Sequence, residues 1–297
     1  MGSRGPIALL HEHPTWSRAL LDRMATRGVD VRPVDVGDPD AVARTLDDAV
    51  GIERWINRIN AMPSDGRPTS VVAAAGHLLL ALDLRGQRVI NGHHVWAIGA
   101  SKAAQAELFR RAGLATPASA AVHEPAAIPE PADAIGYPVL VKPNVGGSGS
   151  GIARFDRGDE LRAAVDAGAI DLGIDGTGLV QRLIEPADGL VHRIEMLGDD
   201  LFYATDQIAR PGDFNYCAAD GCAVDAIALV GPTSEVVAEA RSIMAASGAD
   251  VAGVEYLVDA DGNRVYFDFN PYSNVLNNRD EELGFDPIDR YLDHVLR

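Results

Sequence analysis

The chain is poor in cysteine, in cationic residues and in long apolar runs. Its two cysteines, Cys217 and Cys222, lack the closer spacing and the further Cys or His partners of a zinc site, so we interpret them as small side chains that line a substrate pocket. No apolar run approaches the roughly 18 residues of a membrane span, and no charged-then-apolar leader opens the sequence. These absences predict a reduced, cytoplasmic setting without a membrane partner.

Acidic residues outnumber basic ones. The 297 residues carry 43 Asp and Glu against 26 Lys and Arg, for a formal net charge of −17. This charge would repel a phosphate backbone, and no run of Lys and Arg interleaved with aromatic residues offers a local exception, so nucleic acid is not expected as a partner. An acidic protein that binds a nucleotide must gather its few cations at one place or use a metal ion to bridge like charges.

The length and the pattern predict an α/β and α+β chain of two or three units. In residues 1–95, strand-like segments alternate with helical ones, which is typical of a parallel sheet with helices on both faces. A helix is expected over 101–112 with Ser101 as its N-cap, and the Pro-rich and Ala-rich stretch 116–138 is expected to be a connector. Strands then dominate, which predicts an α+β arrangement for residues 100–297.

The stretch PVLVKPNVGGSGSGIARF places Lys142 at the end of an apolar run, shortly before a loop of glycine and serine. Backbone N–H groups of such a loop can converge on phosphate oxygens, because no Cβ prevents close approach. The lysine precedes the glycines and the loop leads into a strand, so this is not a Walker loop, and we expect a β-hairpin flap with Lys142 at its base. A flexible hairpin tip without a ligand is an equally good interpretation of the loop alone.

The stretch GVEYLVDADGNRVYFDFNP, near the C-terminus, predicts two strands joined by a tight turn. Asp268 and Asn270 share one face of the second strand, and strand pairing can bring Glu255 alongside. Two carboxylates and an amide oxygen form a set of hard oxygen ligands that suits Mg²⁺. Phe267 and Phe269 are expected to pack the opposite face, and the alternative interpretation is a solvated strand face.

The order of these features is specific: Lys102, then a strand with Lys142 and the Gly/Ser loop, then LVQRLIEP, then an acid and an acid-x-Asn pair. This order resembles the ATP-grasp superfamily, most closely the RimK-like α-glutamate ligase group of carboxylate–amine ligases. The resemblance covers almost the whole chain, including WINRINAMPSD and RVINGHHVWAIGASKAAQAELFRRAGLATP. It implies an ATP-grasp fold with an N-terminal Rossmann-like pre-ATP-grasp domain over 1–95, a central subdomain with the flap over 96–185, and a C-terminal subdomain with the Mg²⁺ site over 186–297.

The resemblance also assigns roles to residues. Two lysines would contact the α- and β-phosphates of ATP, the Gly/Ser loop would close over the triphosphate, and a strand end would hydrogen-bond adenine through its backbone. The residues assigned to ATP are Lys102, Lys142, Gly146, Gly147, Ser148, Gly149, Ser150, Gly151, Gln181, Arg182, Leu183, Ile184 and Glu185, and those assigned to Mg²⁺ or Mn²⁺ are Glu255, Asp268 and Asn270. The family normally has Glu where Asp268 stands, and the shorter side chain would shift or weaken one metal.

Two arginines match family arginines that lie near the γ-phosphate and the bound carboxylate. Arg193 and Arg210 would neutralise charge on an acylphosphate, although each could instead be a surface ion-pair residue. Relatives carry a ribose-binding acid where this chain has Val191, a role that Glu185 or Asp188 could take. Relatives also have a basic stretch where this chain reads NYCAADGC, so the substrate is expected to differ.

The implied reaction is ligation. ATP would phosphorylate a small-molecule or peptide carboxylate, and an amine would displace the phosphate to give an amide. Family members are commonly dimers or tetramers, so a homo-oligomer is expected. Two alternatives stay open, namely an ATP-grasp kinase that phosphorylates a hydroxyl and a non-catalytic nucleotide-binding protein. His11 and His13 at the end of the first predicted strand, and Arg58 at the end of another, are candidates for facing the substrate.

Overall fold

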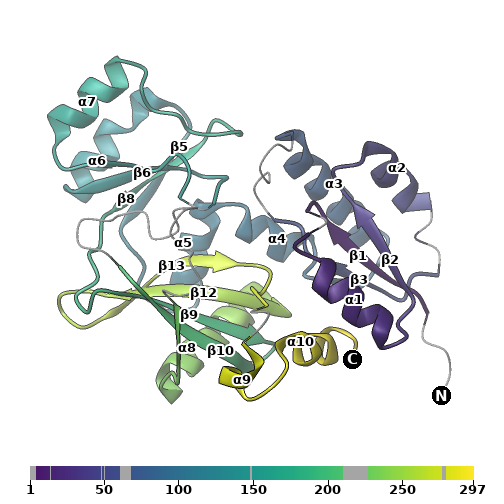
Figure 1. Cartoon of the computed structure of the whole chain (residues 1–297). Helices are drawn as coiled ribbons and strands as arrows, with labels where there is room; N and C mark the ends of the chain where they lie inside the picture. Colours follow the sequence, from purple (N-terminus) through teal and green to yellow (C-terminus); the bar gives the residue numbers. More distant parts are fainter. Residues whose placement is uncertain are drawn as a thin grey trace.

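The computed structural model describes residues 5–13, 15–47, 49, 51–60, 68–147, 149–209, 227–275 and 279–297. Within these residues the strands form three sheets, one of parallel strands and two of antiparallel strands (Figure 1). No helix in the described ranges combines the length and the apolar character that a membrane span requires. The expected mixture of α/β and α+β structure is confirmed.

The N-terminal sheet is parallel, with the strand order β2-β1-β3-β4. Its strands are β1 (Ile7–His11), β2 (Val31–Asp35), β3 (Arg54–Asn57) and β4 (Val89–Ile90), and its helices are α1 (Arg18–Thr26), α2 (Pro39–Asp47) and α3 (Ser70–Leu84). Alternate side chains of a strand point to opposite faces, so Ile7 and Leu9 pack with Met24 of α1, whereas Ala8 and Leu10 pack with α3. The predicted parallel sheet with helices on both faces is therefore confirmed.

The central sheet is antiparallel, with the strand order β11-β10-β9-β12-β13. Its strands are β9 (Leu190–Leu197), β10 (Asp200–Ile208), β11 (Ile227–Val230), β12 (Val251–Val258) and β13 (Arg264–Asn270), and the helices packed on one face are α5 (Lys102–Arg111) and α8 (Ser234–Ser247). Phe109 of α5 meets Tyr266 of β13 at a ring-centroid distance of 5.9 Å. Ser101 caps α5 as predicted, because its Oγ accepts the Ala104 N–H at 3.2 Å.

The third sheet, with the strand order β5-β8-β6-β7, is covered by two helices of its own (Figure 1). Its elements are β5 (Ser119–Val122), α6 (Pro129–Ile135), β6 (Val139–Pro143), β7 (Ala153–Phe155), α7 (Gly158–Asp166) and β8 (Gly178–Arg182). The buried residues that pack together here all lie between Val122 and Val180. This sheet therefore has a core separate from those of the other two.

The stretch 116–138 is not a plain connector, and that prediction is wrong. It contains β5, a 3₁₀ turn (Pro125–Ala127) and α6. Pro125 and Pro129 stand at the first turn of their helical segments, where the N–H that proline lacks has no intrahelical acceptor. The same prolines that suggested a connector are therefore helix starts.

Several short elements were not predicted. They are α4 (His93–Gly99), α7, β11 and α9 (Asp280–Leu283). None of these segments spans more than nine residues, which is too few for a helical or strand periodicity to stand out.

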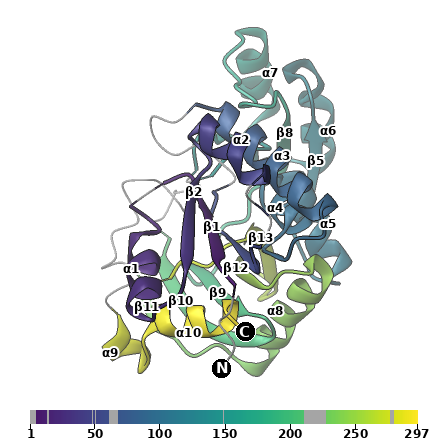
Figure 2. The same cartoon turned by 90° about the vertical axis from the view of Figure 1, so that its right-hand side faces the viewer.

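The N-terminal and central sheets are joined by one apolar cluster and one buried asparagine. Ile7, Leu9 and Ile56 pack with residues of β9, β10 and β12 and with α10 (Pro287–Val295), which lies beside α1 (Figure 2). Asn91, fully buried after β4, donates through Nδ2 to the carbonyls of Val251, at 2.6 Å, and of Pro271. Its Oδ1 accepts the N–H of Asp250 at 2.7 Å. The asparagine thus fixes the start of β12 and the end of β13 to the N-terminal sheet.

Asn91→Ala should lower the free energy of unfolding by about 2–4 kcal/mol, because it removes the hydrogen bonds to two buried carbonyls and to the partly buried N–H of Asp250. Thermal and urea unfolding of the whole chain measure this change. Leu84→Ala is the control, since Leu84 is 80% exposed and should shift the free energy by less than about 0.5 kcal/mol. Equal stability of the two variants would contradict the structural role given to Asn91.

Candidate active site

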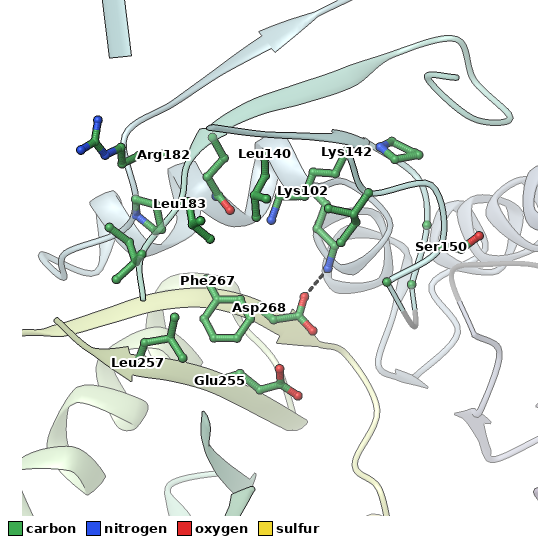
Figure 3. Close-up of a pocket in the computed structure, with 18 residues that line it drawn as sticks. Lys102, Leu140, Lys142, Ser150, Arg182, Leu183, Glu255, Leu257, Phe267 and Asp268 are labelled. Carbon is green, nitrogen blue, oxygen red and sulfur yellow. Dashed lines mark hydrogen bonds and ion pairs between the residues drawn. The ribbon is translucent and has the colours of Figure 1, made fainter. Parts of the chain in front are cut away.

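A pocket of about 810 Å³, counting the part open to solvent, lies between the third sheet and the central sheet (Figure 3). Lys102 and Lys142 extend into it from one side, and Glu255 and Asp268 from the other. Of the residues assigned to ATP and metal, those that line the pocket are Lys102, Lys142, Gly146, Gly147, Gly149, Ser150, Gln181, Arg182, Leu183, Ile184, Glu255 and Asp268. Residues far apart in the sequence therefore meet at one place.

Lys102 begins helix α5 and Lys142 lies on strand β6, and Asn144 brings them together. Its side-chain Oδ1 accepts the Ser101 hydroxyl and the Ala103 N–H, each at 3.0 Å, at the start of α5. Its backbone carbonyl accepts the Lys102 N–H, also at 3.0 Å. Because Asn144 directly follows β6, it fixes Lys102 at the start of α5 against Lys142 on β6.

The lysines differ in their charge partners. Lys102 forms an ion pair with Asp268. Lys142 is buried and, within the part of the chain that the structure describes, pairs with no carboxylate. Burial and then the neighbouring Lys102 ammonium lower the pKa of Lys142 to about 8, although Asp268 acts in the opposite direction. The pocket thus holds a cation that forms no ion pair with the carboxylates of the described residues.

Glu255 and Asp268 stand opposite each other on β12 and β13, as predicted. Burial raises the pKa of Glu255 above its usual range, despite the adjacent Arg193 guanidinium. Burial also acts to raise the pKa of Asp268, but the neighbouring cations, Lys102 foremost with Arg193 and Lys142, together hold that pKa below the ordinary value. The neighbouring cations therefore hold Asp268 ionised more strongly than Glu255.

Arg193 lies under these acids rather than at the surface. Its Nε donates to Glu195 at 2.7 Å and its Nη1 to Glu255 at 2.6 Å. Burial acts to lower the pKa of Arg193, but the two carboxylates hold it well above the usual range. Gly253 on β12 provides the space, because a Cβ there would overlap the guanidinium. Arg193 is thus fixed in a buried network, and the surface ion-pair interpretation is wrong.

Phe267 does not pack the face opposite Asp268, so that prediction is wrong. The pairing of β12 with β13 shifts register between Glu255 and Tyr256, which leaves Phe267 as an extra residue in a β-bulge. The bulge turns its ring to the pocket, beside Asp268 (Figure 3). Phe269 is buried against α5 as expected, at 1% exposure.

The Gly/Ser loop joins β6 to β7, which pair as an antiparallel hairpin. The predicted β-hairpin with Lys142 on its first strand is confirmed. Gly151 has a φ of +74°, and a Cβ at this position would come within 2.8 Å of Pro143, so only glycine fits. Ser148 lies outside the described residues.

The end of β8 forms the wall next to the flap. The Arg182 N–H donates to Ala118 at 2.8 Å and the Leu183 N–H to Pro138 at 3.1 Å, so these two donors already serve the third sheet. Glu185 is 69% exposed at its side chain and lies 3.8 Å from Arg154. It does not line the pocket itself.

The model of the RimK-like ATP-grasp domain family matches residues 99–292. The chain belongs to this family. It is 26% identical over 189 residues to a probable alpha-L-glutamate ligase 2 of Shewanella frigidimarina, covering 63% of this chain and 61% of that protein. It is 27% identical over 180 residues to a ribosomal protein bS6–L-glutamate ligase of Shigella boydii, covering 60% and 58%. The chain thus spans about three fifths of the length of these curated relatives.

Solved structures of ATP-grasp proteins share the fold. A RimK domain ATP-grasp protein from Sphaerobacter thermophilus superposes with a TM-score of 0.70 at 22% identity, covering 98% of this chain and all of that one. A D-alanine–D-alanine ligase from Bacillus anthracis, in complex with ATP, gives a TM-score of 0.70 at 15% identity over 98% and 96% of the two chains. The ATP-grasp fold expected from the sequence is therefore confirmed, while the domain boundaries near 95 and 185 stay predictions.

Some residues assigned by the ATP-grasp resemblance lie beside the pocket rather than in its lining. Gly151 and Asn270 are among them, and Asn270 Nδ2 donates to Asp268 at 3.2 Å. Val191, in place of the family's ribose-binding acid, is buried, and Asp188 is bound to His192 at 2.9 Å. Of the two substitutes considered, only Glu185 is largely exposed. Arg210, Cys217 and Cys222 lie outside the described residues.

Glu195 and Asn144 are functional residues that the sequence analysis missed. Glu195 is fully buried and binds Arg193 from the same face of β9. The period of two in HRIEML could have found it, since residues i and i+2 of a strand share a face. Asn144 gave no such signal, because its hydrogen bonds join segments 41 to 43 residues apart.

The residues present match the metal site expected from the ATP-grasp resemblance only in part. Among the described residues no group of three or more His, Cys, Asp or Glu could hold a metal ion. The expected set has only two carboxylates and the Asn270 amide, so this result does not exclude it. Glu255 Oε2 is buried without a hydrogen-bond partner, as is Glu195 Oε2. Buried carboxylate oxygens without donors fit a bound cation.

Glu195→Gln should destabilise the chain by about 2–3 kcal/mol, because it removes one of the two charges that neutralise the buried Arg193. Thermal unfolding without ligands measures the effect. The matched change Glu185→Gln, at an exposed glutamate, should leave the melting temperature within about 1 °C. If both variants had the same melting temperature, the buried network would not hold the sheet as described.

Proposed function

We propose that this chain is an ATP-dependent ligase that joins a carboxylate to an amine through an acylphosphate. The observation that carries the proposal is the meeting of two lysines, a glycine-rich hairpin and two carboxylates in one pocket. In a chain with a net charge of −17, few other arrangements could attract a triphosphate. Membership of the RimK-like ATP-grasp family and the ligase names of its curated relatives support the same reaction.

Lys102 and Lys142 would bind the α- and β-phosphates of ATP, with the hairpin from Gly146 to Gly151 over them. The unneutralised charge of Lys142 supports this assignment. Gln181 to Ile184 would bind adenine, through backbone groups other than the two N–H donors that serve the third sheet. Glu185 would bind the ribose.

Glu255, Asp268 and Asn270 would hold Mg²⁺ or Mn²⁺, which would neutralise the phosphates when bound. Arg193 keeps its place through Glu195 and Glu255, and its Nη2 is buried without a hydrogen-bond partner. That N–H group is thereby left to stabilise negative charge on the reacting substrate. We propose the same role for Arg210.

The reaction would proceed in two displacements. A carboxylate oxygen of the first substrate bonds to the γ-phosphorus as the bond to the ADP oxygen breaks. An amine nitrogen of the second substrate then bonds to the acyl carbon, phosphate leaves, and the nitrogen loses a proton. The chain would contribute position and charge stabilisation rather than a covalent nucleophile.

The substrates are small-molecule or peptide acids and amines. The curated relatives are named for L-glutamate and, in one case, a ribosomal protein, so L-glutamate is the first amine to test. We further propose that the protein works in the cytoplasm as a homo-oligomer.

Lys142→Ala and Asp268→Ala should each abolish ADP formation with the fold retained, because both residues act on charge in the pocket. ADP release, screened over panels of acids and amines, measures turnover, and mass analysis identifies the product. Arg157→Ala is the control, since Arg157 is exposed and lies outside the pocket. Wild-type turnover in either pocket variant would refute the site. A stable phosphorylated product formed without amine, rather than an acylphosphate, would show a kinase instead.

The affinity for ADP should fall as pH rises above about 8. Lys142 has a lowered pKa of about 8, so its positive charge is present below that pH and lost above it. The expected loss is up to about tenfold per pH unit, measured by calorimetry between about pH 7 and 9.5. Lys142→Met, which cannot titrate, should bind more weakly with a flat pH dependence. An unchanged wild-type affinity across this range would contradict the assignment of Lys142.

A further inference from the structure

Arg58 lies at the carboxyl end of β3, a central strand of the N-terminal parallel sheet. Its backbone N–H donates to Leu10 at 2.8 Å, which fixes the chain against β1 as the strand ends. The carboxyl ends of parallel strands are where open α/β sheets bind ligands. Arg58 is partly buried at this edge.

The guanidinium of Arg58 is held in one place. Its Nη1 donates to the carbonyl of Ser273 at 2.7 Å. Its Cζ lies 5.4 Å from the ring centroid of Tyr272 and 5.5 Å from that of Tyr291. Ser273 and Tyr291 are fully buried. Cation–π contacts on two rings and one hydrogen bond orient the group without neutralising it.

Among the described residues no carboxylate pairs with Arg58. Arg193, by contrast, has two carboxylate partners within 2.7 Å. A partly buried cation without an anion is unfavourable, particularly where acidic residues are plentiful enough to supply one. A fixed planar guanidinium without a partner is suited to bind a carboxylate from outside the chain.

The segment that Arg58 contacts begins at the active site. Tyr272 follows Asn270 by two residues, and it is flanked by Pro271, whose carbonyl binds Asn91, and by Ser273, whose carbonyl binds Arg58. Burial raises the pKa of Tyr272 to about 12, and the charges of Arg58, Arg193, Glu12 and Asp268 all act on the same phenol. Tyr272, which contacts Arg58, therefore follows the strand that carries Asp268 by two residues.

We propose that Arg58 binds a carboxylate of a substrate and that this carboxylate is not the one that reacts. The reacting carboxylate must lie by the phosphates, near Lys142 and Asp268, whereas Arg58 lies at the end of β3 on the N-terminal sheet and does not line that pocket. The inference rests on the proposed ligase function. It narrows the substrates to those with a spare carboxylate, namely an amino acid as the amine or a dicarboxylic acid as the acyl donor.

The test compares wild type and Arg58→Gln with matched substrates. The amines are the common amino acids and their carboxamides, and the acids are dicarboxylic acids and their half-amides, with ADP release as the readout. For the substrate with the free carboxylate, Arg58→Gln should raise KM by about 10- to 100-fold, with KM for ATP unchanged. For the corresponding amide, wild type and Arg58→Gln should give equal KM values. The panel that shows the difference identifies which substrate Arg58 binds.

A structural control comes from the other end of the same strand. Arg54 also donates through Nη1 to a backbone carbonyl, that of Val295 at 2.7 Å. Arg54→Gln should therefore lose a comparable hydrogen bond to a backbone carbonyl. Its effect on KM should be the same for the acid and for the amide. Arg58→Lys, which keeps the charge but not the planar fork, should recover part of the loss.

Binding without ATP separates this inference from the ligase proposal. Without ATP, the same acids and amines should raise the melting temperature of wild type and Arg54→Gln but not that of Arg58→Gln. Thermal shift of the full chain measures this change. Equal discrimination of acid and amide by wild type and Arg58→Gln, in turnover and in thermal shift, would overturn the role of Arg58. A different result would support the role of Arg58 and refute the ligase proposal. Binding would depend on the carboxylate and be lost in Arg58→Gln, while wild type released no ADP with any pair of substrates.

Discussion

The burial of Arg193 between Glu195 and Glu255 is the constraint on which the site depends. One cation shared by two acids holds β9 and β12 at a fixed distance and leaves one oxygen of each acid without a donor. Gly253 makes this possible, because any side chain there would displace the guanidinium. The network explains how the carboxylates of Glu195 and Glu255 can lie close together beneath the pocket.

Lys102 and Lys142 differ in whether a carboxylate of the pocket pairs with their ammonium groups. Asp268 is bound to Lys102, so one of the acids in the pocket is already neutralised, while Lys142 keeps an unmatched charge. Arg58, on the N-terminal sheet, contacts two tyrosine rings, which orient its guanidinium without neutralising it. Among the described residues no carboxylate pairs with Lys142, beside the flap, or with Arg58, at the end of β3.

Much of this could be predicted from the sequence, because it follows from periodicity and local chemistry. The alternation of the N-terminal strands, the Ser101 cap and the pairing of Glu255 with Asp268 all need only neighbouring residues. The bulge at Phe267 could not be predicted, since it depends on register between strands, and neither could Asn91 or Asn144, whose partners are distant in the sequence. The prolines of 116–138 misled because the same residue serves loops and helix starts.

The third sheet has its own core, yet Asn144 binds its strand β6 to the start of α5, which packs with the central sheet. Three hydrogen bonds accepted by this one residue therefore cross the boundary between two separately packed cores. The relative placement of the Lys102 and Lys142 ammonium groups depends on this short polar junction rather than on either core.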